Sequence, residues 1–136
     1  TGTNRKLYNF LNREKFKKKI ITFGFIDNIE ELMSIADLII TKPGGITTAE
    51  ALSKGLPMVI IEPLPGQERS NTDYLVDKKV AIIAKKSSSI DKIVKEILLD
   101  KERLVSMSES AKILSKPYSA IEIAKLAISL CDNVNI

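Results

Sequence analysis

The sequence predicts an α/β fold in which helices cover both faces of a parallel sheet. Short apolar runs alternate along the chain with segments of helical periodicity, which is the pattern of parallel α/β proteins. The apolar runs are continuous rather than alternating, as expected for strands that are buried on both faces. The predicted strands are residues 20–23, 38–40, 58–61 and 80–83.

Helical periodicity fills the intervals between these strands. The predicted helices are residues 5–16, 28–35, 46–54 and 69–78. Small residues dominate the third of them, which we expect to end with Gly55 as a C-cap before Leu56 and Pro57. Asp27 and Asn28, followed by Glu31, are good residues for the start of the second helix.

The last third of the chain is predicted to be helical. Ser88 followed by Asp91 resembles a capping box, and apolar residues keep helical spacing over 90–98 and again over 104–114. Pro117 then interrupts the chain. We expect a final helix with a buried stripe formed by Ala120, Ala124, Ala127 and Cys131.

The composition is that of a globular domain. The chain has 136 residues, of which 44% are apolar and 28% charged, and no apolar run approaches the ~20 residues that cross a bilayer. The one cysteine, Cys131, cannot form an internal disulfide and is expected to be a small buried hydrophobe in a reducing, cytoplasmic setting. Histidine is absent, which removes the commonest general base and the commonest metal ligand, so we expect no metal site.

The net charge of +4 is concentrated near the start of the chain. Seven basic residues between Arg5 and Lys19 face a single acidic residue, Glu14. Such a segment can bind anionic lipid or nucleic acid, or it can be a solvated helix face followed by a loop. Aromatic residues are few, with only Tyr8, Phe10 and Phe16 in this segment, and we expect no nucleic acid as a partner.

A Pro-Gly-Gly turn at residues 43–45 is the best clue to function. It connects a predicted strand to a helix that begins near Ile46, and it leaves free backbone N–H groups at the positive end of the helix dipole. Open α/β sheets bind phosphorylated ligands at this edge. Glu50 lies one helical turn beyond Thr47, so a diphosphate at the helix N-terminus and a ribose beside the carboxylate would satisfy both residues.

Two further loops are expected at the same edge, because parallel strands end together. After the first strand, Gly24 allows a flat ring to approach and Phe25 offers a face for stacking, although a plain turn with a core aromatic would have the same sequence. In the loop at residues 62–68, prolines and a glycine hold Gln67 and Glu68 at the tip. An amide beside a carboxylate suits the adjacent hydroxyls of a sugar, but it is also a common surface pair.

The four N-terminal residues resemble the turn that follows a strand. The first strands of a doubly wound sheet lie at its centre, so the four strands predicted here would lack their middle. We therefore expect residues 1–136 to be the back part of a larger nucleotide-binding domain that extends further at its N-terminus.

The sequence resembles one protein family. Four segments carry the resemblance, and they are residues 24–33, 36–51, 55–60 and 65–71. The second contains Lys42-Pro43-Gly44-Gly45-Ile46-Thr47, and the fourth reads Pro65-Gly66-Gln67-Glu68-Arg69-Ser70-Asn71. They are similar to monogalactosyldiacylglycerol synthases and processive diacylglycerol glucosyltransferases, relatives of the lipid-II N-acetylglucosaminyltransferase. The resemblance implies a GT-B glycosyltransferase with two Rossmann-like domains, of which this chain is similar to the C-terminal, donor-binding one.

The resemblance also implies roles for individual residues. Gly24, Phe25 and Ile26 would meet the uracil of a UDP-sugar through their backbone. Gly44, Gly45 and Thr47 would bind the diphosphate, and Glu50 the ribose hydroxyls. Gln67 and Glu68 would bind the sugar, with Asn71 supporting their loop.

The family's glycine-rich phosphate loop and its acceptor domain, which usually holds the catalytic base, have no counterpart in these residues. The implied activity is transfer of a hexose from a UDP-sugar to diacylglycerol or a glycosyl-diacylglycerol, at the cytoplasmic membrane surface and without a cofactor. This piece alone would be inactive. Two alternatives remain open: a non-catalytic donor-binding subunit that docks on a membrane-bound partner, and a nucleotide-sugar epimerase of the same fold.

Overall fold

The computed structural model describes residues 1–61 and 63–132 of the chain. The chain divides into two compact units, Thr1–Leu32 and Met33–Ile136, which are considered separately below. Among the described residues, no helix is both long enough and apolar enough to cross a membrane.

The first unit contains helix α1, Arg5–Arg13. The Asn4 side chain caps its N-terminus by accepting a hydrogen bond of 3.0 Å from the backbone N–H of Leu7. The chain then folds back, since the amino group and hydroxyl of Thr1 both donate to the carbonyl oxygen of Phe23, at 2.9 and 2.8 Å. Helix α2, Ile29–Ser34, begins directly after Asn28, as the sequence predicted. The side-chain amide of Asn28 donates to the Glu31 carboxylate at 2.9 Å.

The predicted strand at residues 20–23 is wrong. The structure has no regular element there, and Ile20 and Ile21 are exposed. A strand is stabilised by hydrogen bonds to a neighbouring strand, and no described strand pairs with this segment. An apolar run by itself is therefore not sufficient to form a strand.

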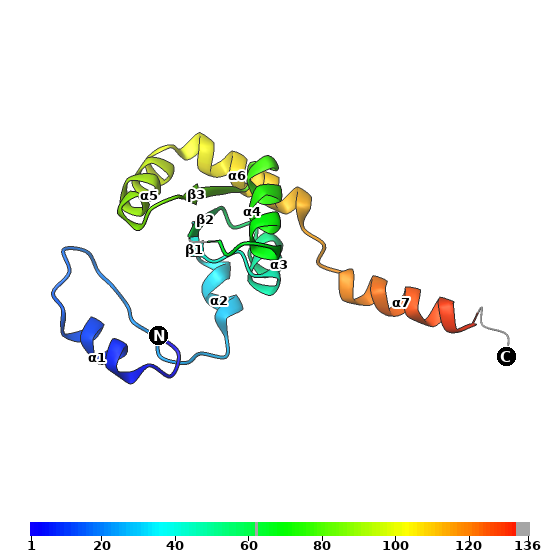
Figure 1. Ribbon diagram of the computed structural model, residues 1–136, viewed down its shortest axis with the longest axis horizontal. Coiled ribbons are helices and arrows are strands. Elements are labelled where there is room, and N and C mark those ends of the chain that lie inside the picture. Colours follow the sequence, from blue (N-terminus) through cyan, green and yellow to red (C-terminus); the bar gives the residue numbers. More distant parts are fainter. Residues whose placement is uncertain (62, 133–136) are drawn as a thin grey trace. The chain divides into compact units, whose positions relative to one another are not determined.

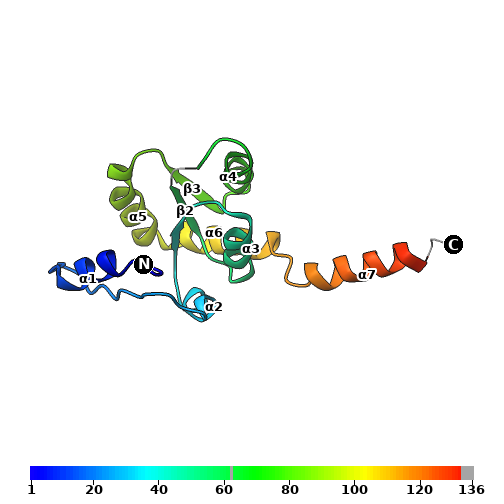
Figure 2. The same cartoon turned by 60° about the horizontal axis from the view of Figure 1, so that its bottom comes forward.

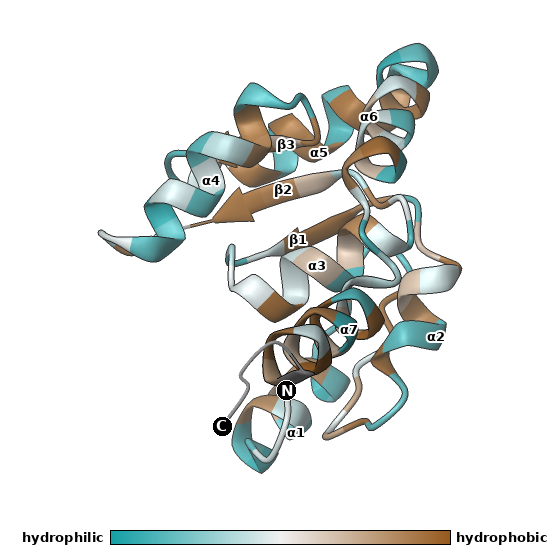
Figure 3. Cartoon of the chain, turned by 90° about the vertical axis from the view of Figure 1, so that its right-hand side faces the viewer, coloured by the Kyte–Doolittle hydropathy of each residue, from teal (hydrophilic) through white to brown (hydrophobic). Residues whose placement is uncertain are grey.

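The second unit contains a three-stranded parallel sheet of order β1-β2-β3 (Figure 1). The strands are β1 Ile39–Thr41, β2 Met58–Ile61 and β3 Ala81–Ala84. Ile39 pairs with Met58, which in turn pairs with Ala81. All three lie within one residue of the strands predicted from the apolar runs, and β1 and β2 are mostly brown, that is hydrophobic, in Figure 3.

Helices cover both faces of this sheet (Figure 2). On one face, Met58 and Ile60 form a core with Ala51 of α3, Gly45–Ser53, and Leu75 of α4, Gln67–Asp77. On the other face, Val59 forms a second core with residues of α5, Ile90–Leu99, and α6, Lys101–Leu114. Because neighbouring residues of β2 serve opposite faces, the whole strand has to be apolar.

Helix α3 ends as the sequence predicted. Gly55 follows its last turn with φ +66°, and the N–H groups of Gly55 and Leu56 donate to the carbonyl oxygens of Leu52 and Ala51 at 3.0 and 2.9 Å. These two bonds are a Schellman motif. Helix α4 ends in the same way, but with Lys79 at φ 60° in the place of the glycine.

Two expectations for the C-terminal third are wrong. Helix α5 has Ser89 as its N-cap residue, not Ser88, and no side-chain capping bond is made. A short 3-10 turn, Ser87–Ser89, precedes this helix, and the Ser89 hydroxyl donates back to the carbonyl oxygen of Lys86 at 2.6 Å. The serine run therefore forms its own turn and does not cap the helix.

The second correction concerns α7, Ser119–Asp132. The stripe expected to be buried, Ala120, Ala124, Ala127 and Cys131, is exposed, as is every residue from 119 to 131. Helical spacing of apolar residues predicts a helix with an apolar face, but it does not supply the surface that covers that face.

Candidate functional site

The turn after β1 carries the first part of the candidate site. Pro43 is buried, and the Gly44 N–H donates to the carbonyl oxygen of Lys42 at 2.9 Å, which closes a tight turn. Gly44 is the N-cap residue of α3 and has φ −65° and ψ 143°. No side chain caps this helix, so the N–H groups of its first turn have no intrahelical acceptor.

Neither glycine of this turn is required by the protein itself. The backbone of Gly44 and of Gly45 lies outside the left-handed region, and a Cβ atom at either position would meet no atom within 4 Å. A side chain would therefore cause neither strain nor a clash within the chain. What the glycines provide is open space above the free N–H groups, through which a ligand can approach the backbone closely.

Of the polar side chains of α3, Thr48 stabilises the turn, whereas Thr47 and Glu50 are free to bind a ligand. Thr48 is buried, and its hydroxyl donates to the carbonyl oxygens of Gly44 and Gly45 at 2.9 and 3.0 Å, so it holds the turn from below. The sequence reasoning missed Thr48, although threonine often bonds back along a helix in this way. Thr47 and Glu50 are half-buried, and neither side chain forms a hydrogen bond or ion pair with the described residues.

The loop after β2 differs from the expected geometry. Gly66 has φ 94° and ψ −131°, a backbone conformation that essentially only glycine adopts, and α4 begins at the next residue. Gln67 and Glu68 therefore lie in the first turn of a helix and not at the tip of a loop. Gln67 is exposed, whereas the Glu68 carboxylate accepts a hydrogen bond of 2.8 Å from the backbone N–H of Leu64 and so closes the loop. Glu62, at the start of this loop, lies outside the described residues.

Asn71 joins these two segments. Its side-chain amide donates a hydrogen bond of 3.0 Å to the carbonyl oxygen of Pro43, 28 residues away. The next residue, Thr72, is fully buried and bonds back to the carbonyl oxygen of Glu68 at 2.8 Å. In the structure the Asn71 side chain thus holds the turn after β1, and its expected support of the loop at 62–68 stays a prediction. The turn at 43–45 and the start of α4 consequently lie side by side.

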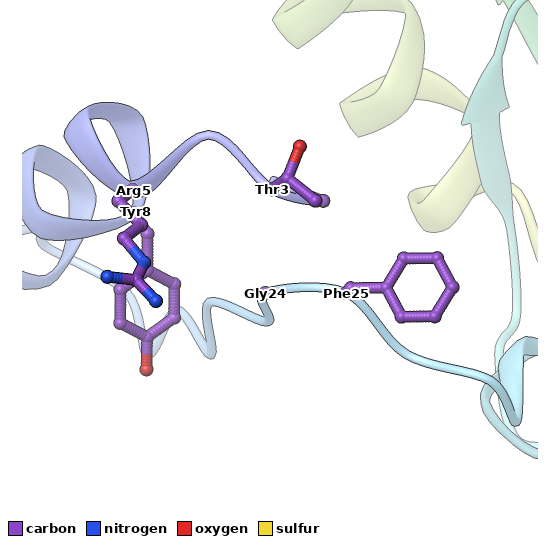
Figure 4. A pocket seen from close by; sticks show the side chains of 6 residues that line it. Thr3, Arg5, Tyr8, Gly24 and Phe25 are labelled. Carbon is purple, nitrogen blue, oxygen red and sulfur yellow. The ribbon is translucent and has the colours of Figure 1, made fainter.

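Residues 24–26 belong to the first unit. Gly24 and Phe25 line a hollow of about 470 Å³ together with residues of α1 and of the N-terminal turn, among them Arg5 and Tyr8 (Figure 4). The Phe25 side chain is 78% exposed and points away from Arg5 and Tyr8, so it is not a core aromatic. That these residues share an edge with the other two loops stays a prediction. Sequence reasoning gave Arg5 and Tyr8 no place near Gly24.

The described residues contain no group of three or more acidic, cysteine or histidine side chains placed to hold a metal ion. The arrangement is instead an uncapped helix N-terminus beside a carboxylate, with an amide and a second carboxylate on the neighbouring helix. Parallel α/β domains with such a turn after a strand bind phosphorylated ligands through backbone N–H groups.

The chain belongs to the family described as the glycosyltransferase family 28 C-terminal domain, whose sequence profile matches residues 1–123. It is 38% identical over 99 residues to the processive diacylglycerol beta-glucosyltransferase of Bacillus licheniformis, covering 73% of this chain and 26% of that protein. The protein of the same description from Staphylococcus carnosus is 31% identical over 134 residues, covering 97% of this chain and 34% of that protein. The chain thus spans about a quarter to a third of the length of these relatives.

A solved structure supports the fold. The chain is similar to the crystal structure of MurG from Acinetobacter baumannii, with a TM-score of 0.66 and 24% sequence identity. The similarity covers 76% of this chain and 32% of that one. At this identity the likeness concerns the fold alone. Together with the family match, it confirms the predicted α/β class and the resemblance that the sequence motifs indicated.

Proposed function

We propose that this chain is the donor-binding half of a glycosyltransferase that moves a hexose from a UDP-sugar to diacylglycerol or a glycosyl-diacylglycerol. The observation that carries the proposal is the open turn at Gly44 and Gly45, tied by Asn71 to the helix that begins with Gln67 and Glu68. In this proposal the open turn binds the anionic part of the donor, and the two polar side chains at the start of the neighbouring helix, which suit hydroxyl groups, bind its sugar.

In this proposal the nucleotide lies across the N-terminus of α3. The free N–H groups of Gly45 and the following residues, with the Thr47 hydroxyl, bind the diphosphate. Glu50, which has no partner among the described residues, accepts hydrogen bonds from the ribose hydroxyls. The backbone at residues 24–26 contacts the uracil.

The sugar is bound at the start of α4. Gln67 is exposed and has both donors and an acceptor to offer, which suits neighbouring hydroxyl groups. Glu68 already accepts the Leu64 N–H through one oxygen, Oε2, and its second oxygen is left for the sugar. This division fixes the carboxylate before the ligand arrives and so lowers the ordering cost of binding.

The chemical step needs a base that these residues do not provide. Histidine, the commonest general base, is absent from the chain, and in this proposal the two carboxylates of the site bind the ribose and the sugar, so we assign no catalytic residue here. The contribution of this chain to the reaction is electrostatic. Negative charge develops on the leaving diphosphate, and the helix N-terminus and the Thr47 hydroxyl stabilise that charge.

The lipid acceptor is inferred from the relatives. Proteins described as processive diacylglycerol beta-glucosyltransferases are 31–38% identical to this chain. The acceptor and the base would lie in a further domain, and the whole enzyme would work on the cytoplasmic face of the membrane without spanning it.

A second candidate is a non-catalytic donor-binding subunit that docks on a membrane-bound partner. The observation that favours it is α7, on which Ile123, Leu126 and Leu130 are all at least 60% exposed. A free-standing chain would cover this face with its partner. Under both proposals the nucleotide site is the same.

Calorimetric titration of the chain with UDP tests the site that both proposals share. We expect saturable binding that weakens when UDP is replaced by UMP, because UMP lacks the second phosphate that reaches the α3 N-terminus. Uridine, which has no phosphate, should bind more weakly still. Equal heats for the three compounds, or none, would refute the diphosphate site.

A further inference from the structure

A groove runs along the free edge of β3, away from the proposed nucleotide site. It has a volume of about 550 Å³ and is bounded by the end of α4 on one side and by α6 on the other. Its floor is apolar and includes Ile82, Ile83 and Met107. Three cations also line it: Lys79, Lys85 and Arg103.

The edge of β3 offers unpaired backbone groups to this groove. Among the described strands, β3 pairs only with β2, and the N–H of Met58 donates to the carbonyl oxygen of Val80 at 3.0 Å. In a parallel ladder alternate residues direct their peptide groups to the same neighbour. Val80 and Ile82 therefore face β2, whereas the peptide groups of Ala81 and Ile83 face the open side.

The three cations have no acidic partner among the described residues. Ion pairs occur at Arg69–Asp73, Lys78–Asp77 and Lys92–Glu96, and none of them involves a residue of the groove. Lysines alone could merely protect a strand edge from aggregation. Arg103, however, comes from α6, and the apolar floor remains uncovered, so the groove combines three separate kinds of recognition element.

These features select one kind of occupant. A small anion would use the cations but neither the strand edge nor the floor. A second copy of this chain, paired edge to edge, would bring lysine against lysine, and like charges directly opposite are destabilising. An extended segment with alternating acidic and apolar residues would satisfy the backbone groups, the floor and the cations together.

We propose that the β3 edge is a docking site for an extended acidic segment of a partner protein, which adds to the sheet as a fourth strand. Its backbone pairs with the peptide groups of Ala81 and Ile83. Its apolar side chains rest on Ile82 and Met107, and its carboxylates meet Lys85 and Arg103. The site is independent of the proposed nucleotide site.

Fluorescence anisotropy with a labelled acetyl-Glu-Val-Glu-Val-Glu-Val-amide peptide tests this proposal on the 136-residue chain. We expect saturable binding below about 1 mM, the range of weak strand addition. The double variant Lys85→Glu, Arg103→Glu should bind at least about tenfold more weakly, because attraction becomes repulsion at two positions. The control, Lys95→Glu with Lys116→Glu, alters exposed cations outside the groove and likewise moves the net charge from +4 to 0, and it should bind normally.

A second peptide separates strand addition from simple charge attraction. Methylating alternate backbone nitrogens of the same peptide removes its edge donors and should abolish binding, with the charges unchanged. The proposal is overturned if the methylated peptide binds equally, if both double variants lose binding equally, or if no saturation is reached. It is overturned in favour of a lipid if anionic vesicles of phosphatidylglycerol lose binding to the groove variant while the peptide never binds.

Discussion

The Asn71 amide and the Pro43 carbonyl oxygen lie 3.0 Å apart and form a hydrogen bond that connects α4 to the turn before α3. Pro43 is fully buried and Asn71 half-buried, so water cannot easily replace this bond. The bond fixes the two parts of the candidate site relative to each other, one with free N–H groups and one with the side chains proposed to bind the sugar. It gives Asn71 a positioning role, and it makes the site depend on contacts distant in the sequence.

Replacing Asn71 with leucine should lower both the stability of the chain and its affinity for UDP. The variant leaves the Pro43 carbonyl oxygen without its donor, at a cost of about 1–3 kcal/mol. Thermal unfolding and calorimetry with UDP measure the two effects. Arg69→Ala is the control, because it removes only an exposed ion pair on the same helix. If Asn71→Leu changed stability but left UDP affinity intact, Asn71 would have no role in positioning the turn.

Glu50→Ala should weaken UDP binding without unfolding the chain. Losing both hydrogen bonds from the ribose to a carboxylate should cost roughly 1.5–3 kcal/mol of binding free energy. Stability should hardly change, since the carboxylate has no protein partner among the described residues. Calorimetric titration is the measurement, with Glu109→Ala as a matched helical carboxylate. An unchanged dissociation constant would show that Glu50 is an ordinary surface residue.

Changes at Gln67 and Glu68 should separate the sugar from the nucleotide. Glu68 also closes its own loop through Leu64, so Gln67→Ala combined with Glu68→Gln preserves an acceptor there. In the full-length enzyme this pair of changes should strongly reduce turnover, while UDP affinity stays within about twofold, because UDP carries no sugar for them to contact. A matching loss of UDP affinity would show that these residues bind the phosphates instead of the sugar. Undiminished turnover would show that they are ordinary surface residues.

The basic segment before residue 20 should attract anionic membranes. Lys15, Lys17, Lys18 and Lys19 are exposed, and each cation near such a surface contributes ~1 kcal/mol at low salt. Neutralising all four should reduce sedimentation of the full-length enzyme with anionic vesicles, and salt should have the same effect on the unmodified enzyme. Equal vesicle binding by the two proteins at low salt would show that these four lysines do not mediate membrane binding.

The C-terminal ends of α3 and α4 should differ in how a change of side chain affects the stability of the chain. Gly55→Ala places a Cβ in the left-handed region and 2.8 Å from the Lys112 side chain, so it should destabilise the chain by about 1–2 kcal/mol. Lys79→Gly relieves the same backbone strain at the end of α4 and should stabilise the chain by up to about 1 kcal/mol. Urea unfolding measures both variants. Loss of stability in Lys79→Gly would contradict this account.

The local elements were readable from the sequence. Continuous apolar runs gave β1, β2 and β3, and Gly55 marked the end of α3, because burial on both faces and a left-handed cap each restrict the residues allowed. The Pro-Gly-Gly turn at 43–45 and its helix were equally local, since they depend on the turn residues and the first helical residues alone.

What the tertiary structure decided was which segments meet. The run at 20–23 is as apolar as a strand but has no paired neighbour among the described strands, and the apolar face of α7 has no described surface to cover it. The hydrogen bond from Asn71 to Pro43 joins residues that are 28 positions apart in the sequence, and no sequence pattern in either segment predicts it. Periodicity records which faces of an element are apolar, whereas pairing and long-range hydrogen bonds depend on a second segment whose position only the folded chain supplies.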